Sequence, residues 1–133
     1  MVVGRGPTGA VQFRVRGCAQ AQTHQHVTAA PNLSELGAEI AIARAKQAAG
    51  LAISDVRYAA VYDSFTITLL MLLEDLGLAS RGEAASMVLS AHFSRHGAMP
   101  LNTPGGLFGY GHSGLTGPMP PLAGTPSQTP AVG

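Results

Sequence analysis

Apolar and polar side chains along the chain fall into segments whose spacing predicts alternating strands and helices. Residues 11–16 alternate apolar and polar side chains with a period of two, which is typical of a half-buried strand. Residues 56–62 are rich in valine, tyrosine and alanine and predict a short buried strand. Residues 34–49 and 65–76 read as helices that follow these two strands. The order of elements favours an α/β fold.

The two predicted helices differ in how their apolar residues are distributed. Residues 34–49 are rich in alanine, begin with acidic side chains and end with basic ones, which suits the helix dipole. Residues 65–76 are apolar on every face until Glu74 and Asp75, which predicts a helix inside a core. Gly50 is the expected stop of the first helix, since glycine favours the helix C-terminus.

Short polar side chains precede both helices and can cap them. Asn32 and Ser34 are the candidates for the first helix, and Asp63 and Ser64 for the second, which Gly77 ends. Gly77 precedes a third and weaker helical stretch at residues 82–90.

Glycine and proline dominate the chain from residue 98 onward, and 5 of the 9 prolines follow Gly117. Residues 118–133 therefore predict a disordered Pro/Gly-rich tail. Residues 1–10 are interpreted as a disordered N-terminal extension, which leaves residues 11–117 as the domain.

Charge is scarce in this chain and changes what can be expected of its surface. Of 133 residues 46% are hydrophobic and only 11% are charged, where about 25% is usual. Such a chain is expected to leave apolar surface uncovered. The net charge of +1 excludes a nucleic-acid binder that works through a basic face.

Neither a membrane nor an export signal accounts for this apolar excess. The longest apolar run is Leu69–Leu73, far shorter than the ~20 residues of a membrane span. No signal peptide is evident, so a cytoplasmic location is expected. A single cysteine excludes a disulfide framework and a four-cysteine zinc site within this chain.

The glycine-rich segment Gly109–Gly114 matches the letters of a dinucleotide fingerprint, but no acidic residue follows to bind a ribose. The histidines suggest a metal site only weakly. His24 and His26 are two positions apart, and His92 and His96 are four apart, but neither pair has a third ligand nearby. We therefore expect no metal, although a metal-dependent hydrolase using His24, His26 and His112 is a third hypothesis.

Two side chains are better placed for chemistry. His112 lies in a glycine-dense turn, where a neutral imidazole can polarise a carbonyl or move a proton near pH 7. Tyr62 ends a predicted strand before a helix, where α/β sheets commonly bind ligands. The simpler alternatives are a turn histidine and a core tyrosine.

Six short segments follow one another at intervals that match one family. They are Thr23–His26, Tyr62–Thr68, Leu73–Gly77, Arg81–Glu83, Leu101–Gly106 and the pair Gly111–His112. Together they resemble the C-terminal half of a thiolase of the sterol-carrier or lipid-transfer type, similar to acetyl-CoA acetyltransferases and incomplete at both ends. The resemblance covers roughly residues 11–117.

This resemblance implies half of a layered α-β-α-β-α sandwich, usually found in dimers. Its members make or cleave carbon–carbon bonds beside a CoA thioester, so it implies an acyltransferase acting on CoA thioesters of lipid or steroid type. The thioester is the substrate, and no bound cofactor is implied. His112 would help to activate a cysteine of the other half and shape an oxyanion hole, and Tyr62 stands where the family has His or Asn. The implied substrate-binding residues are His24, Asn102, Gly105, Gly106 and Gly111.

The chain also departs from the thiolase pattern. The half that carries the nucleophilic cysteine is absent, and Cys18 is expected to be a small buried residue. Ser113 replaces the proline of the Gly-His-Pro motif, and past Gly117 the tail replaces the family's last helix and strands. The chain alone is therefore expected to be inactive, and an inactive truncated half-domain is one alternative.

A branch of the family offers another alternative. It has tyrosine at the position of Tyr62, lacks the cysteine, and includes aldolases of steroid side-chain breakdown that work with a small OB-fold partner. In that branch tyrosine hydroxyls handle the proton, and Tyr110 is the second candidate. A free tyrosine has a pKa of about 10, so this role needs hydrogen bonds or nearby positive charge.

Overall fold

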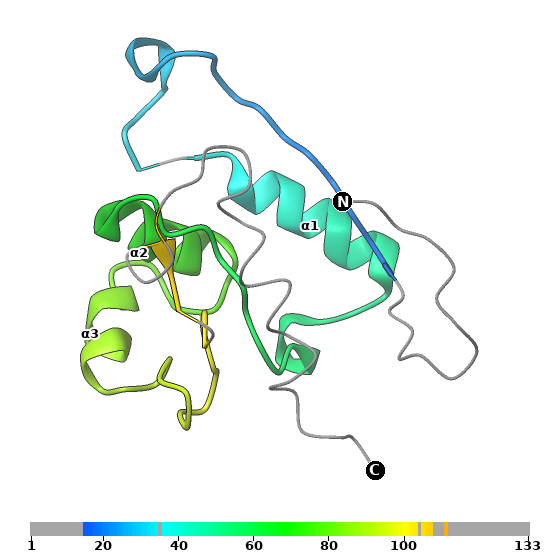
Figure 1. Cartoon of the computed structure of the whole chain (residues 1–133). Helices are drawn as coiled ribbons and strands as arrows, with labels where there is room; N and C mark the ends of the chain where they lie inside the picture. Colours follow the sequence, from blue (N-terminus) through cyan, green and yellow to red (C-terminus); the bar gives the residue numbers. More distant parts are fainter. Residues whose placement is uncertain (1–14, 35, 104, 108–110, 112–133) are drawn as a thin grey trace.

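The computed structural model describes residues 15–34, 36–103, 105–107 and 111 (Figure 1). Its elements, in chain order, are η1 (Val27–Ala29), α1 (Ala38–Ala49), η2 (Ile53–Asp55), α2 (Thr66–Asp75) and α3 (Ala84–Leu89). Helix α2 packs between the other two, contacting both α1 and α3. The predicted terminal segments 1–10 and 118–133 lie outside the described residues.

The first predicted helix is confirmed, but α1 begins at Ala38, four residues later than expected. The Asn32 side-chain oxygen accepts hydrogen bonds from the Ser34 amide (2.9 Å) and hydroxyl (2.8 Å), which holds a turn instead of capping a helix. Gly37 then takes a left-handed conformation with φ 73°, and α1 starts after it. Gly50 ends α1 in the same conformation, as predicted.

Helix α2 forms where its pattern predicts, but its predicted caps are wrong. Phe65 is the N-cap residue, its backbone is extended, and no side chain caps the helix. The Asp63 carboxylate instead accepts a hydrogen bond from the Leu107 amide. The weak third stretch is confirmed as the shorter α3.

The prediction that α2 lies wholly inside a core is wrong for the described residues. Only Leu73 and Asp75 of α2 are buried. Ile67 is 63% exposed and the preceding Phe65 is 69% exposed. A helix that is apolar all round has no preferred side, so its pattern could not tell which side the rest of the chain would cover.

One hydrophobic core lies between α2, α3 and the returning chain that follows α3 (Figure 1). Its buried members are Leu73, Ala79, Ala84 and Phe93. The partly buried side chains packed against them are Leu69, Leu70, Leu78, Met87, Met99 and Leu101. The core therefore brings the chain near residue 101 against α2, close to the start of the predicted site.

Charged side chains at the C-terminal end of α2 contact the segment that leads into α3. One carboxylate oxygen of Glu74 accepts hydrogen bonds from the amides of Gly82 (2.9 Å) and Ala84 (3.3 Å). The buried Asp75 carboxylate pairs with the Arg81 guanidinium at 2.7 Å. Contact with Asp75 raises the pKa of Arg81, partial desolvation opposes this, and Glu39 and Glu74 add to it. The pairs Glu74–Asp75 and Arg81–Gly82 therefore have a structural role, because their contacts join the end of α2 to the segment before α3.

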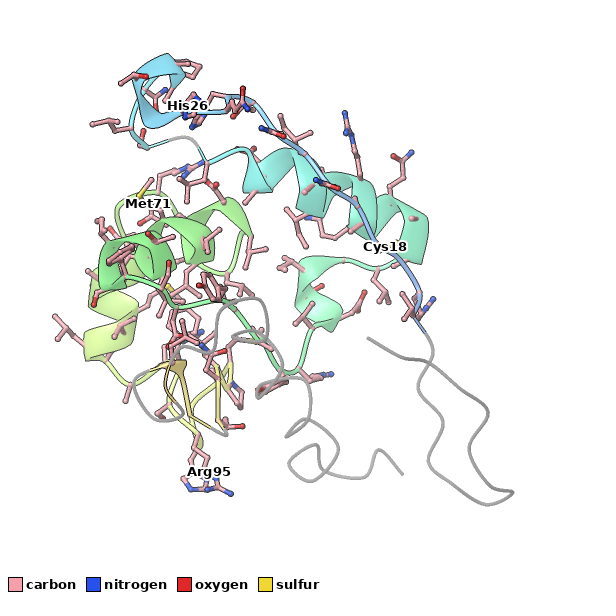
Figure 2. The ribbon with its side chains drawn as sticks, turned by 45° about the horizontal axis from the view of Figure 1, so that its top comes forward. Cys18, His26, Met71 and Arg95 are labelled. Atoms are coloured by element: carbon pink, nitrogen blue, oxygen red, sulfur yellow. The ribbon has the colours of Figure 1, made fainter. Side chains whose placement is uncertain are left out.

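An extended segment runs along α1 in the opposite direction (Figure 1). Gly17 lies against the Ala45 carbonyl and Ala49, with no room for a β-carbon, and Thr23 lies against Gly37 at the other end of α1. Since side chains alternate along an extended chain, Cys18 points away from the helix and is exposed (Figure 2). The expectation of a buried cysteine is therefore wrong.

The layered sandwich is not confirmed in the part of the chain that the structure describes. Among those residues, the only β pairing is an isolated parallel bridge between Ala59 and Leu101. Residues 15–16, at the end of the first predicted strand, form no strand, and residues 11–14 lie outside the described ranges. A strand exists only where a neighbour pairs with it, and a period of two cannot supply that neighbour. Among the described residues, no helix is long and apolar enough to cross a membrane.

Candidate functional site

The candidate site begins where residues 59–63 meet residues 100–107. The Ala59 amide donates to the Pro100 carbonyl and the Asn102 amide donates to the Ala59 carbonyl, both at 3.0 Å. These two bonds make the parallel bridge between Ala59 and Leu101. The predicted strand 56–62 is thus reduced to one pairing, which anchors both segments beside the core.

Asn102 continues this pairing with its side chain. Its backbone is left-handed, with φ 45°, a conformation that asparagine tolerates better than most residues. Its side-chain oxygen accepts a hydrogen bond from the Val61 amide (2.9 Å), and its side-chain nitrogen donates to the Val61 carbonyl (2.8 Å). The side-chain amide of Asn102 therefore takes the place of a neighbouring backbone as the hydrogen-bond partner of Val61.

Asp63 makes the second connection between the two segments. Its Oδ1 accepts a hydrogen bond from the Leu107 amide at 3.2 Å. Its Oδ2 lies against Gly106 so closely that a β-carbon at this position would collide with the carboxylate. The Leu107 carbonyl in turn accepts a hydrogen bond from the Gly111 amide at 2.7 Å. A β-carbon at residue 106 would therefore displace the Asp63 carboxylate from its present position.

Tyr62 lies between these two connections. The preceding Val61 is buried, whereas Tyr62 is 37% exposed. Because neighbouring side chains of an extended segment point in opposite directions, the phenol faces away from the side on which Val61 is buried. This is not a fully buried core tyrosine. The backbone on both sides of Tyr62 is fixed, and its ring remains partly accessible.

The other predicted site residues are only partly brought together. Gly105 donates its amide hydrogen to the Asn102 carbonyl at 2.8 Å, which places it in the turn beside Tyr62, and Gly111 is exposed. His24 precedes η1, which lies apart from residues 100–107 in both views (Figures 1 and 2). Its Nδ1 is 2.9 Å from the Thr23 hydroxyl. The predicted catalytic residues His112 and Tyr110 lie outside the described residues.

The remaining histidines do not form a metal-binding helix face. His92 packs the edge of its ring against Phe93, with ring centroids 4.9 Å apart, and His96 is exposed in the turns that follow α3. In Figure 2 the nearby Arg95 extends outward from this region. Among the described residues, no three His, Cys, Asp or Glu side chains form a group that could hold a metal ion.

Sequence reasoning missed the part that Asp63 plays. It assigned this side chain to the start of α2, because a short polar residue before a helix is usually a cap. The signal that could have found the contact is the pair Gly105–Gly106, since glycine often marks a close approach of another group.

Residues 19–128 match the family described as "Thiolase C-terminal domain-like". This match covers most of the 133 residues. The chain belongs to that family. The thiolase resemblance of its ordered motifs is thereby confirmed at the level of the superfamily, whereas the sterol-carrier type is not.

Two relatives of this thiolase-like domain are similar to it in sequence. It is 36% identical over 88 residues to a 17-hydroxy-3-oxo-4-pregnene-20-carboxyl-CoA lyase of Mycobacterium tuberculosis, covering 63% of the chain and 22% of the lyase. It is 35% identical over 85 residues to a steroid side-chain-cleaving aldolase of Thermomonospora curvata, covering 61% of the chain and 22% of the aldolase. The chain thus spans about a fifth of the length of these relatives.

A solved structure, that of an Ltp2-ChsH2(DUF35) aldolase, is similar to the domain in fold. The TM-score is 0.58 at 32% sequence identity, covering 65% of this chain and 24% of that one. All three proteins are described as lyases or aldolases. The comparisons therefore favour the retro-aldolase alternative over the acyltransferase interpretation.

Proposed function

We propose that this thiolase-like domain is part of a retro-aldolase that cleaves a carbon–carbon bond in the steroid side chain of a CoA thioester. The observation that carries the proposal is the placement of Tyr62, a partly exposed phenol on a backbone held on both sides by Asn102 and Asp63. The similarity to two steroid side-chain lyases or aldolases supports the class of substrate.

The chemistry of such a cleavage needs proton transfer but no nucleophilic cysteine. A base takes the proton of a hydroxyl that is β to the thioester carbonyl, and the bond between the β- and α-carbons breaks. The β-carbon becomes a ketone, while the α-carbon keeps the electron pair as a thioester enolate and then takes a proton. A positioned tyrosine can carry either proton.

Within this proposal Tyr62 handles a proton at the reacting centre, with Tyr110 as the second phenol. His112 supplies an acid–base group or an oxyanion contact near the thioester carbonyl. The Gly105–Gly106 backbone lines the turn that approaches the substrate, and Gly111 lies between Tyr110 and His112 in the chain. The CoA thioester remains the substrate, with no bound cofactor.

We further propose that the domain works within a larger assembly, as a homodimer or with a partner chain. The similar structure is named for two components, Ltp2 and ChsH2(DUF35), which makes a partner of that kind the first candidate. The partner expected from the thiolase-branch resemblance is a small OB-fold protein. The exposed apolar residues Phe65 and Ile67 also favour a cover supplied from elsewhere.

The experiment replaces the matching segment of the Mycobacterium tuberculosis lyase with this domain and measures cleavage of that lyase's CoA substrate. We expect Tyr62→Phe to lower kcat by about 100-fold or more, because the ring stays and only the proton-carrying hydroxyl is lost. The matched control is Tyr58→Phe. The Tyr58 hydroxyl is buried with no hydrogen-bond partner among the described residues, so its removal should leave kcat within about twofold.

His112→Ala is expected to abolish turnover in the same chimera. Full activity of either Tyr62→Phe or His112→Ala would contradict its assigned role. A chimera that folds and transfers acyl groups to CoA, without cleaving the steroid substrate, would favour the acyltransferase. A folded chimera with neither activity would favour the inactive half-domain.

A further inference from the structure

We infer that Asp63 is a positioning residue, whose carboxylate holds the turn at residues 105–107 against the segment that carries Tyr62. The contact between Asp63 and the turn does not depend on the proposed function. The effect of Asp63 on turnover rests on that function.

The Asp63 carboxylate is directed at the turn and not at α2, the helix that follows Asp63. No side chain caps α2, although Asp63 precedes it by three residues. One carboxylate oxygen instead accepts the Leu107 amide hydrogen at 3.2 Å. The other oxygen contacts the α-carbon side of Gly106. The two oxygens of one side chain therefore lie against consecutive residues of the turn, Gly106 and Leu107.

A second hydrogen bond links the contact between Asp63 and Leu107 to Gly111. The Leu107 peptide receives the hydrogen bond of Asp63 at its amide, and its carbonyl accepts the Gly111 amide hydrogen at 2.7 Å. Gly111 is covalently joined to Tyr110 and to His112. The carboxylate thus reaches, through two hydrogen bonds, the residue between the two other proposed catalytic side chains.

Tyr62 lies between the side-chain hydrogen bonds of Asn102 and the side-chain hydrogen bond of Asp63. On one side Asn102 binds both backbone groups of Val61, and on the other side Asp63 binds Leu107. A carboxylate suits this place because a hydrogen bond to a charged acceptor is stronger than one to a neutral acceptor. Asp63 therefore fixes the distance between Tyr62 and the turn.

The first test measures amide hydrogen exchange in the 133-residue chain by NMR. We expect Asp63→Ala to speed exchange at Leu107 and Gly111 by about tenfold, while the amide of buried Leu73 is unchanged. The control is Asp55→Ala, because Asp55 also accepts one backbone amide hydrogen, that of Ala52 at 2.8 Å. Asp55→Ala should leave Leu107 and Gly111 unchanged.

The second test uses the lack of space at Gly106. In the parent chain, Gly106→Ala forces a β-carbon into the Asp63 carboxylate and should speed exchange at Leu107 and Gly111 as strongly as Asp63→Ala. In the Asp63→Ala background the space is vacated, so Gly106→Ala should add less than about twofold. Equal effects of Gly106→Ala in both backgrounds, or unchanged Leu107 exchange in Asp63→Ala, would overturn the inference.

The third test joins the turn to catalysis in the chimeric lyase. Asp63→Ala should lower kcat about tenfold and change KM by less than about threefold, because the reacting groups are misplaced while most substrate contacts remain. Asp63→Asn, which keeps an acceptor oxygen of the same shape, should recover at least half of the parent kcat. Should Asp63→Ala unfold the chimera, which faster amide exchange at Leu73 would reveal, the variants Asp63→Asn and Gly106→Ala are measured in its place.

The outcomes separate the two proposals. If exchange at Leu107 responds but Tyr62→Phe leaves turnover intact, the positioning contact stands and the proposed function fails. If Tyr62→Phe abolishes turnover but exchange at Leu107 ignores Asp63→Ala, the proposed function stands and the inference about Asp63 fails.

Discussion

Both ends of α2 carry large apolar side chains, but these side chains lie in opposite surroundings. At the C-terminal end Leu73 is fully buried and Asp75 is 4% exposed, whereas at the N-terminal end Ile67 is 63% exposed. Helix α3 and the chain that follows it cover one end, whereas Phe65 and Ile67 stay largely exposed at the other. The contrast shows that burial of an apolar helix is decided by its neighbours.

The covered end also carries the charges. Asp75 pairs with Arg81 through one carboxylate oxygen, and Glu74 accepts hydrogen bonds from the amides of Gly82 and Ala84. The uncovered end instead leads back to Tyr62 and its connections. One end of α2 therefore contributes Leu73 to the core, and the other leads to the candidate site.

The largest effect is expected from removing the core side chain of the covered end. Leu73→Ala should lower the free energy of unfolding by about 3 kcal/mol, because it loses buried apolar contacts and leaves a cavity. Chemical denaturation followed by circular dichroism measures this loss. A loss as small as that of a surface substitution would mean that the core near α3 is not formed in solution.

A smaller effect is expected from the charge pair at the same end. Asp75→Asn should destabilise the chain less than Leu73→Ala, because Arg81 is half exposed and can return to water. The same denaturation experiment is repeated with Arg81→Met and with both substitutions. If the two single losses simply add, the residues do not interact, whereas a pair predicts that the double variant loses less than the sum.

The smallest effect is expected at the uncovered end. Ile67→Ser should change the free energy of unfolding by no more than about 0.5 kcal/mol, because an exposed side chain loses little on replacement. Denaturation at two protein concentrations tests this. A larger loss that grows with concentration would show that another chain covers this end in solution, and the contrast between the two ends would disappear.

The helices were predictable because their signals are local. A stretch rich in alanine followed by Gly50, and an apolar run followed by Gly77, define α1 and α2 within a few residues. The strands were not, because pairing depends on segments distant in sequence. Residues 56–62 join residue 101 only through the bridge at Ala59.

The candidate site divides in the same way. The motif pattern singled out Tyr62, Asn102 and Gly106 as residues of interest. It could not show that the Asn102 side chain binds Val61 backbone, or that Gly106 faces Asp63, because these contacts join positions about forty residues apart.

The sequence by itself determined the thiolase family, the helices and their C-terminal ends, since these depend on ordered motifs and on neighbours within a few residues. Only the tertiary structure decided which end of α2 is buried and what Asp63 binds. The physical reason is that an apolar face and a carboxylate each accept several partners of similar energy. The packing of distant segments then selects one of them.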